Sequence, residues 1–226
     1  LPIDQKELRE LQNKLEDTSD DLRGSRWSAI SKATSRSQFL VSNRKNQILD
    51  SIPDENKEKA VNLLSNLKDE LDELGQIANE KNKVSFLDVR RQSLKTIDDI
   101  ESLLISNNFP YKIPSEYDNL PRLLGRANVE IKTSKGNMSA IIDGYNAPLT
   151  AGSFIDLSLK GFYDDLPINR AEEFFILQTG DPKGEEIGYI DPDTNELRKV
   201  PLEIRTPNFE DTLYGETFEE VGLYTE

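Results

Sequence analysis

The chain has 226 residues and is strongly acidic, with 42 Asp and Glu against 28 Lys and Arg and a formal net charge of −14. Such a field repels phosphate backbones and anionic lipid, so nucleic acid is not expected as a partner. The sequence has no Cys and no His, which excludes thiolate nucleophiles, cysteine metal sites and the commonest general base. No run approaches the roughly 20 apolar residues of a membrane span, so none is expected.

The composition changes near Pro114. Residues 1–114 carry a net charge of −2 and two Gly, whereas residues 115–226 carry a net charge of −12, ten Gly and seven Pro. Because Gly and Pro mark turns, the first region is predicted to form long helices and the second to form short strands and loops. The expected organisation is a helical bundle over residues 1–108, a Pro-rich linker over residues 109–121 and a second domain over residues 122–226.

Four helical segments are predicted in the first region. The first contains Leu8, Leu11 and Leu15, and the second runs from about Ser25 to Asp50. The third begins near Pro53, which suits the first position of a helix. The fourth follows Ser85-Phe-Leu-Asp88, a pattern typical of a capping box.

The third segment carries the clearest apolar stripe, in which the spacing alternates between four and three residues. Its members are Ala60, Leu64, Leu67, Leu71, Leu74 and Ala78. Amphipathic helices joined by short turns bury such stripes against each other, so a four-helix bundle is expected. A dimerising zipper is the alternative, but the stripe spans fewer than three heptads.

The second region is predicted to begin with a hairpin and a helix. The alternating segment from Arg126 to Lys132 is followed by the turn signal Lys135-Gly-Asn137 and by a partner strand, Met138–Ile142. Asn146-Ala-Pro148 precedes a helix, and an apolar strand covers Phe174–Gln178. This order favours an α+β or barrel arrangement. The predicted apolar face of the helix consists of Phe154, Ile155, Leu157 and Leu159.

One acidic run resembles the start of a calcium loop. Asp191-Pro-Asp-Thr-Asn-Glu196 places oxygen ligands at alternate positions, but Glu196 stands where the sharp turn needs Gly. Leu202 stands at the twelfth position, where such loops need Glu. A plain β-turn between Gly188-Tyr-Ile190 and Val200–Ile204 is therefore expected, and neither a metal nor a cofactor is predicted.

Two blocks in the second region resemble the cyclophilins. Ala147-Pro-Leu-Thr-Ala-Gly-Ser-Phe154, followed by Gly161-Phe-Tyr163, is similar to their first helix and the loop after it. Asn169-Arg-Ala-Glu-Glu-Phe-Phe-Ile-Leu-Gln-Thr-Gly-Asp181 is similar to their signature block. With the helical region and the Pro-rich segment, nearly the whole chain resembles the multidomain cyclophilins of cyanobacteria and the chloroplast thylakoid lumen.

The resemblance implies peptidyl-prolyl cis-trans isomerase activity. Rotation about an X–Pro bond is opposed by amide resonance, with a barrier of roughly 18–20 kcal/mol, and lowering it needs no metal or titrating base. Arg170 matches the family's catalytic position and would stabilise the twisted amide electrostatically. Phe175 and Ile176 match the residues that wall the proline pocket, and Gln178 matches the residue that hydrogen-bonds the substrate backbone.

Two departures from the family pattern lie beside Arg170. Asn169 replaces a frequent His, and the acidic pair Glu172-Glu173 stands where a Pro-Gly turn is usual. An ion pair of Arg170 with one of these carboxylates is the alternative to a catalytic role. It would draw the guanidinium away from substrate, so weak activity is expected.

The largest departure is the end of the sequence. Family members continue with strands that complete the barrel and the pocket, whereas residues 122–226 match only the amino-terminal part of a cyclophilin-like β-barrel. We therefore expect a two-domain α then α+β/β chain whose barrel is truncated. The missing carboxy-terminal part is expected as a cleaved but still associated fragment or as another chain. Leu1 in place of Met likewise indicates a removed leader or a trimmed chain.

Three functional hypotheses follow from the resemblance. The first is an isomerase that acts on proline-containing polypeptides and assists folding or assembly of photosynthetic membrane proteins, with photosystem II subunits as partners. The second is a non-catalytic assembly scaffold that binds a partner through the bundle and the cleft. In the third, the bundle covers the cleft and restricts access to it. The resemblance places the chain in the thylakoid lumen or the periplasm.

Overall fold

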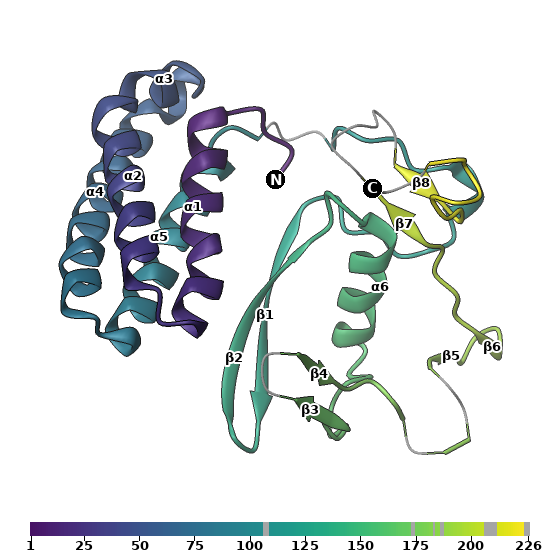
Figure 1. The fold of residues 1–226 in the computed structure, drawn as a ribbon. Helices are drawn as coiled ribbons and strands as arrows, with labels where there is room; N and C mark the ends of the chain where they lie inside the picture. Colours follow the sequence, from purple (N-terminus) through teal and green to yellow (C-terminus); the bar gives the residue numbers. More distant parts are fainter. Residues whose placement is uncertain (106–108, 173–174, 183, 186–187, 206–211, 224–226) are drawn as a thin grey trace. The chain divides into compact units, whose positions relative to one another are not determined.

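The computed structural model describes residues 1–105, 109–172, 175–182, 184–185, 188–205 and 212–223 (Figure 1). The chain divides into two compact units, residues 1–107 and 108–226. No helix in the described ranges combines the length and the apolar character that crossing a membrane requires.

The first unit is helical, as predicted. Its long helices α1, α2, α4 and α5 pack in a ring, in which α1 and α4 each contact both α2 and α5 (Figure 1). The described part of this unit has five α-helices rather than the four expected. Their bounds are α1 Lys6–Arg23, α2 Trp27–Asn43, α3 Lys45–Asp50, α4 Lys57–Glu80 and α5 Lys83–Ser102, with a short 3₁₀ helix, Asp54–Asn56, before α4.

The additional helix arises because the second predicted segment is interrupted. Arg44 lies between α2 and α3 with φ −117° and ψ 14°, outside helical geometry. The side-chain amide of Asn43 donates to the carbonyl of Phe39 at 3.1 Å, a local bond that competes with continuation of the helix. The prediction of one helix through this region was therefore wrong.

The start of α5 also differs from the prediction. Asn82 is the N-cap, and its Oδ1 accepts the backbone N–H of Ser85 at 3.2 Å. Ser85 therefore lies inside the first turn, and the capping box predicted at Ser85–Asp88 is wrong. An Asn three residues earlier satisfies the same need for an acceptor at the helix start.

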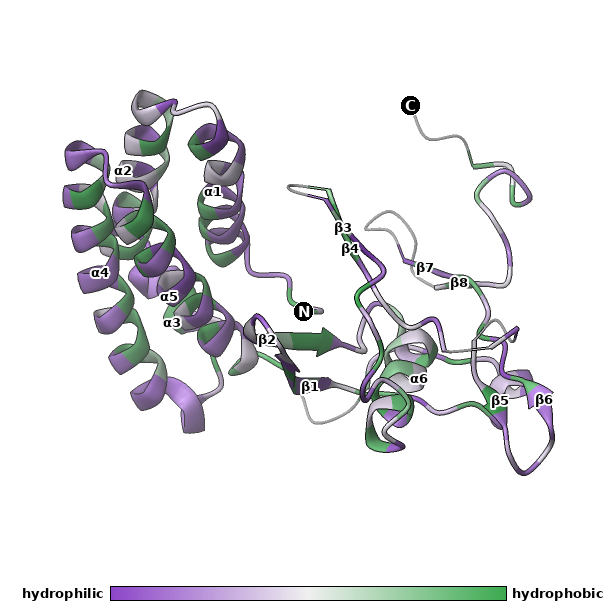
Figure 2. Cartoon of the chain, turned by 90° about the horizontal axis from the view of Figure 1, so that it is seen from below, coloured by the Kyte–Doolittle hydropathy of each residue, from purple (hydrophilic) through white to green (hydrophobic). Residues whose placement is uncertain are grey.

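The predicted apolar stripe of α4 is buried along its whole length. Leu67, Leu71 and Leu74 are fully buried, and Phe86 of α5 packs edge-to-face on Trp27 with ring centroids 6.1 Å apart. The remaining stripe residues are at most 1% exposed. Figure 2 shows hydrophobic and hydrophilic segments alternating along these helices. Mutual burial of such stripes supplies the main stabilisation of the helical unit.

Each interface between neighbouring helices of the ring also contains a polar side-chain contact. Glu10 of α1 pairs with Arg36 of α2 at 2.6 Å, and Arg90 of α5 donates to the Leu15 carbonyl of α1 at 2.7 Å. The other two contacts are hydrogen bonds. Gln38 Nε2 of α2 donates to Asp72 Oδ1 of α4 at 3.1 Å, and Thr96 Oγ1 of α5 donates to Glu70 Oε1 of α4 at 2.9 Å. These directional contacts set the axial register of neighbouring helices, which apolar burial alone does not specify.

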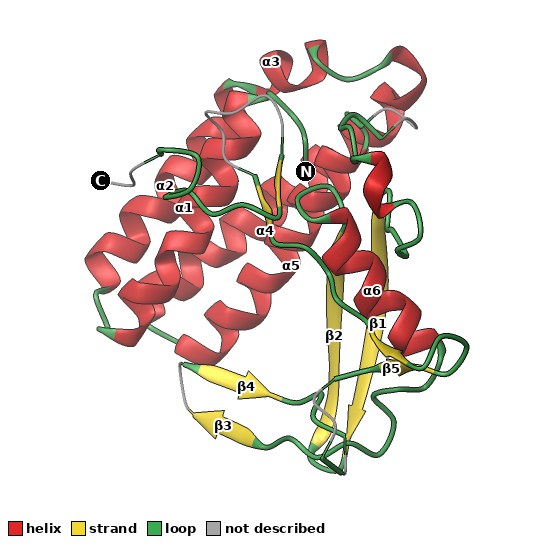
Figure 3. Cartoon of the chain, turned by 90° about the vertical axis from the view of Figure 1, so that its right-hand side faces the viewer, coloured by secondary structure: helices red, strands yellow, loops and turns green. Residues whose placement is uncertain are grey.

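The described part of the second unit combines one α-helix with short antiparallel hairpins (Figure 3). The described strands form four separate two-stranded sheets, β1–β2, β3–β4, β5–β6 and β7–β8. The strands are β1 Arg126–Thr133, β2 Gly136–Asp143, β3 Arg170–Glu172, β4 Ile176–Gln178, β5 Ile190–Asp191, β6 Glu196–Leu197, β7 Glu203–Ile204 and β8 Leu213–Tyr214; the helix is α6 Pro148–Leu159, and a 3₁₀ turn covers Ser115–Tyr117.

The expected barrel sheet is therefore not seen among the described residues. Each strand pairs only with its neighbour in sequence, and β3 to β8 have only two or three residues each. Gly180 and Gly188, between β4 and β5, have positive φ, which favours turns over a longer ladder. The β-rich character was predicted correctly, and the described residues form no closed barrel.

The first hairpin confirms the predicted pair of strands, but β2 begins at Gly136, inside the predicted turn Lys135-Gly-Asn137. β1 and β2 pair from Arg126 opposite Asp143 to Thr133 opposite Gly136, which has φ +139°. The turn therefore lies at Ser134-Lys135. Gly136 permits a backbone conformation that side chains with a Cβ rarely adopt.

Helix α6 begins with Pro148, whose missing N–H costs nothing at this position. Leu149 and Leu157 are buried, but Leu159 is 85% exposed, so its assignment to the buried face was wrong. At Gly152 the backbone of Arg122 passes so closely that a Cβ would lie 2.4 Å from its Cα. This contact packs the segment before β1 directly on the helix.

Two side chains from later in the sequence hold α6. The carboxylate of Glu203 in β7 accepts the backbone N–H groups of Leu149 at 2.9 Å and Thr150 at 2.7 Å. It thus satisfies two free donors of the first turn and places negative charge at the positive end of the helix. Burial and the nearby Glu203 carboxylate raise the pKa of Tyr214 to about 12.

Arg198 makes the second connection. Its guanidinium binds Asp156 of α6 at 2.6 Å and Asp191 of β5 at 3.4 Å, and it lies over the Tyr189 ring, 4.7 Å from the centroid. Burial alone would raise the pKa of Asp156, but hydrogen bonds from Arg198 and Lys160 hold it below its usual range. The cluster joins the helix to the β5–β6 hairpin.

Candidate active site

The four predicted site residues come together on the β3–β4 hairpin. Arg170 lies opposite Gln178, and Glu172 lies opposite Ile176. Directly opposed residues, and residues two apart on one strand, project from the same face of an antiparallel pair. Arg170, Ile176 and Gln178 therefore share one face, while Ala171 and Leu177 project from the other.

Phe175 lies just before β4, beside Arg170. The guanidinium carbon of Arg170 is 5.4 Å from the centroid of the Phe175 ring, within the range of a cation–π contact. The backbone N–H of Phe175 donates to the Glu172 carbonyl at 3.1 Å and closes the hairpin turn. Phe174 and Glu173, the preceding residues of the predicted strand and acidic pair, lie outside the described residues.

Arg170 is also paired with Glu172, its neighbour two positions along β3. Its Nε and a terminal guanidinium nitrogen both lie 2.7 Å from Oε1 of Glu172. The two side chains are 49% and 50% exposed, so solvent screens the pair and its net stabilisation is small. The predicted ion pair with the acidic run is confirmed for Glu172.

The base of the hairpin is held by two further hydrogen bonds. The backbone N–H of Asn169 donates to the Gln178 carbonyl at 2.9 Å, and Thr179 Oγ1 donates to the Pro167 carbonyl at 2.9 Å. The sequence reasoning did not include Thr179 among the site residues. Its place directly after Gln178, inside the cyclophilin-like block, was the signal that pointed to it.

The hairpin offers binding groups rather than a nucleophile. Phe175 is 70% exposed and Ile176 is half-buried, so apolar surface lies next to a permanent cation. Gln178 adds an amide that can both donate and accept. Such a face suits a proline ring and the amide next to it. Among the described residues, no group of three or more Asp or Glu side chains is arranged to hold a metal ion.

Two protein families match the chain, one for each region. Residues 1–105 match the family described as "Peptidyl-prolyl cis-trans isomerase CYP38-like, PsbQ-like domain". Residues 128–221 match the family described as "Cyclophilin type peptidyl-prolyl cis-trans isomerase/CLD". The chain belongs to the cyclophilins with an amino-terminal PsbQ-like domain.

Relatives with the same pair of regions occur in a cyanobacterium and in a plant. A protein of Synechocystis sp., which bears the name of a thylakoid lumen peptidyl-prolyl cis-trans isomerase, is 42% identical over 224 residues, covering 99% of this chain and 59% of that protein. The chloroplastic isomerase CYP38 of Arabidopsis thaliana is 35% identical over 235 residues, covering 99% and 53%. Chloroplastic CYP37 of the same plant is 32% identical over 192 residues, covering 75% and 38%. The chain thus spans little more than half the length of the first two relatives.

Proposed function

We propose that this cyclophilin-type chain catalyses peptidyl-prolyl cis-trans isomerisation at the β3–β4 hairpin. The observation that carries the proposal is the arrangement of Arg170 with Ile176 and Gln178 on one hairpin face and with Phe175 beside its guanidinium. These are the residues that match the family's catalytic and substrate-binding positions. The cyclophilin family match and the names of the relatives support the same activity.

The proposed mechanism needs no covalent step. Phe175 and Ile176 hold the proline ring, and Gln178 hydrogen-bonds the substrate backbone on one side of the bond that rotates. Arg170 donates toward the prolyl amide as it twists, when the nitrogen loses resonance and becomes a better acceptor. The guanidinium acts as a permanent cation, so the mechanism includes no proton transfer.

The competing interaction is the ion pair with Glu172. While Glu172 accepts from Arg170, fewer guanidinium N–H groups are available to the substrate. Because both side chains are half exposed, the exchange of partners costs little. We therefore propose a weak isomerase rather than an inactive one.

The proposed location is the thylakoid lumen, in keeping with the names of the Synechocystis and Arabidopsis relatives. The proposed clients are proline-containing segments of photosynthetic membrane proteins, photosystem II subunits among them. In this proposal the ring of α1, α2, α4 and α5 is a four-helix bundle that serves as the second binding element. The PsbQ-like family match over residues 1–105 supports that assignment.

The deciding test uses Arg170→Ala and Arg170→Lys in an exchange assay on a short Ala-Pro peptide, with NMR measurement of the cis-trans interconversion rate. Both variants are expected to lose most of the catalysed exchange, because Lys keeps the charge but not the planar donor geometry. Exchange by wild type no faster than in buffer would overturn the proposal. Equal rates for wild type and Arg170→Ala would remove Arg170 from the mechanism.

The ion pair also favours a second candidate, a non-catalytic assembly scaffold. A guanidinium engaged by Glu172 does not act on the prolyl amide, and the partner is then bound by the helical bundle and by the other groups of the cleft. Under this alternative, Arg170→Ala leaves the exchange rate and the assembly of the client protein unchanged. Under the isomerase proposal, both fall together.

A further inference from the structure

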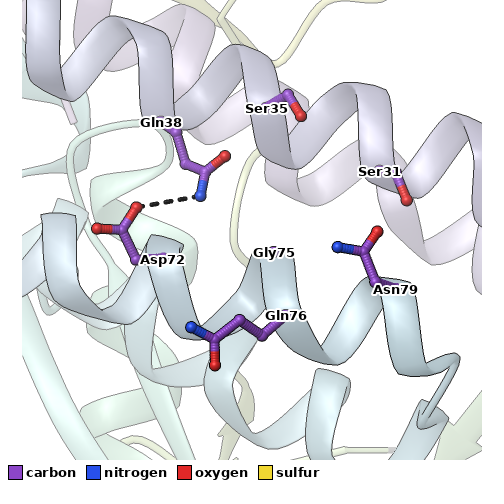
Figure 4. A pocket seen from close by; sticks show the side chains of 7 residues that line it. All are labelled: Ser31, Ser35, Gln38, Asp72, Gly75, Gln76 and Asn79. Atoms are coloured by element: carbon purple, nitrogen blue, oxygen red, sulfur yellow. Dashed lines mark hydrogen bonds between the residues drawn. The ribbon is translucent and has the colours of Figure 1, made fainter.

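A groove lies between α2 and α4 on the helical unit. It consists of two adjoining cavities of about 400 Å³ and about 770 Å³, which share Ser31 and Asn79 as lining residues. Figure 4 shows these two side chains facing each other across the smaller cavity, which ends where Gln38 binds Asp72. The larger cavity lies beside Trp27. We call the two together the α2–α4 groove.

The groove offers hydrogen-bonding groups that the described chain leaves free. The side chains of Ser31, Ser35, Gln76 and Asn79 line it and make no side-chain hydrogen bond to any described residue. Gly75 leaves the groove open, since a Cβ there would lie 3.0 Å from the Gln38 amide nitrogen. Free hydroxyl and amide groups along the α2–α4 groove can form hydrogen bonds with the N–H and C=O groups of an extended backbone.

The α2 side of the groove has a charge opposite to that of the chain as a whole. Residues 22–49, which contain all of α2, have six Lys and Arg and no Asp or Glu, although the chain has 42 acidic residues. Lys32 and Lys81 line the Trp27 end, are exposed, and form no ion pair within the described ranges. The third cation there, Arg26, pairs with Asp21 at 2.7 Å.

Among the described lining residues the one carboxylate is Asp72, at the opposite end from Trp27. It is neutralised by Lys68 at 2.8 Å and accepts from Gln38 at 3.1 Å. The groove therefore presents free cations at one end, free hydrogen-bonding groups along its length and no free carboxylate. The helical region has a net charge of only −2, so an acidic segment meets little repulsion there.

The size of the groove sets the length of its occupant. Trp27 and Gln38 are eleven positions apart on α2, a rise of about 17 Å. An extended peptide of about five residues covers that distance. The polar lining favours a peptide over a lipid surface, which needs a broad apolar helix face.

We propose that the α2–α4 groove binds an extended acidic peptide segment of a partner protein, with its carboxylates at Lys32 and Lys81 and an apolar side chain against Trp27. This binding is separate from the hairpin, so it does not depend on isomerase activity. Trp27 is the only tryptophan in the chain, and its fluorescence therefore reports on the groove directly.

The experiment titrates the full chain with the peptide acetyl-Asp-Glu-Phe-Glu-Ser-amide and follows Trp27 emission. A saturable change in emission is expected, and the same peptide with Lys in place of each acidic residue is expected to produce none. Lys32→Glu/Lys81→Glu is expected to weaken binding at least about tenfold, with an effect that shrinks at high salt. Lys6→Glu/Lys59→Glu is the matched control, since it changes the net charge equally at exposed lysines outside the groove.

A second variant blocks the α2–α4 groove without changing its charge. Ser35 is exposed, so Ser35→Tyr is expected to fold normally, as checked by circular dichroism, and to abolish the emission change. The proposal is overturned if millimolar acidic peptide leaves the emission unchanged, or if the Lys peptide binds equally well. It is also overturned if the control pair loses as much affinity as the groove pair, or if phosphatidylglycerol vesicles change the emission more than the peptide does.

Discussion

Replacing Glu172 by Gln should make the proposed isomerase faster, because it removes the carboxylate that competes with substrate for Arg170. Both side chains of the pair are about half exposed, and such pairs contribute about 0.5 to 1 kcal/mol. If that energy becomes available in the twisted state, kcat/KM rises about two- to fivefold, since about 1.4 kcal/mol corresponds to a factor of ten. Gln keeps the size of the side chain, so the hairpin is expected to stay intact.

The assay is the NMR exchange measurement on an Ala-Pro peptide at low and high salt. Wild type is expected to approach the Glu172→Gln rate as salt screens the pair, whereas the variant itself changes little. Glu185→Gln removes an exposed carboxylate outside the hairpin and serves as the control for net charge. A rate for Glu172→Gln below that of wild type would refute the reasoning. The same holds if Arg170→Ala/Glu172→Gln keeps the increase, because the gain is attributed to the freed guanidinium.

The remaining predictions concern stability. Glu203→Gln is expected to cost about 1–2 kcal/mol at the start of α6, seen as roughly tenfold faster hydrogen exchange of the two amides that its carboxylate holds. Leu71→Ala is expected to lower the free energy of unfolding by about 2–5 kcal/mol in urea titrations, and the exposed Val61→Ala by far less. Burial raises the pKa of Glu70, and the hydrogen bond from Thr96 offsets only part of this. As the pH rises, Glu70 therefore loses its proton at a lower pH in the unfolded chain than in the folded chain. The free energy of unfolding consequently decreases as the pH rises above about 4.5. Unfolding at pH 4 and pH 7 is expected to show a larger gain from Glu70→Gln at pH 7, and an equal gain at both would contradict this.

The helical unit was largely predictable because its main signal is local and periodic. The α4 stripe from Ala60 to Ala78 needs only spacing to be recognised, and all its members are buried. The details that failed depend on single side chains. The side chain of Asn43 donates to the Phe39 carbonyl of its own helix, and α2 ends there. Asn82, rather than Ser85, is the N-cap of α5. Residue type alone does not decide between such near-equal local bonds.

The second unit was predictable only where partners are adjacent in sequence. The hairpin around Gly136 was correct because its turn lies between its own strands. The capping of α6 by Glu203 links positions 54 apart, and no local pattern indicates it. For the candidate site, the family spacing identified Arg170, and the acidic run beside it predicted the ion pair that the structure shows. The catalytic and binding roles of the hairpin residues remain predictions until the exchange assay is done.

The two connections that hold α6 also have a consequence for the order in which the chain is made. The first turn of α6 is synthesised 53 or 54 residues before Glu203, and Asp156 is synthesised 42 residues before Arg198. The whole β3–β4 hairpin lies between these partners, so it emerges before either connection closes. In a nascent chain, the two strands of the hairpin can therefore pair while the first turn of α6 is still uncapped. The connections of Glu203 and Arg198 to α6 are therefore completed after the hairpin has emerged, when those two segments return to the helix.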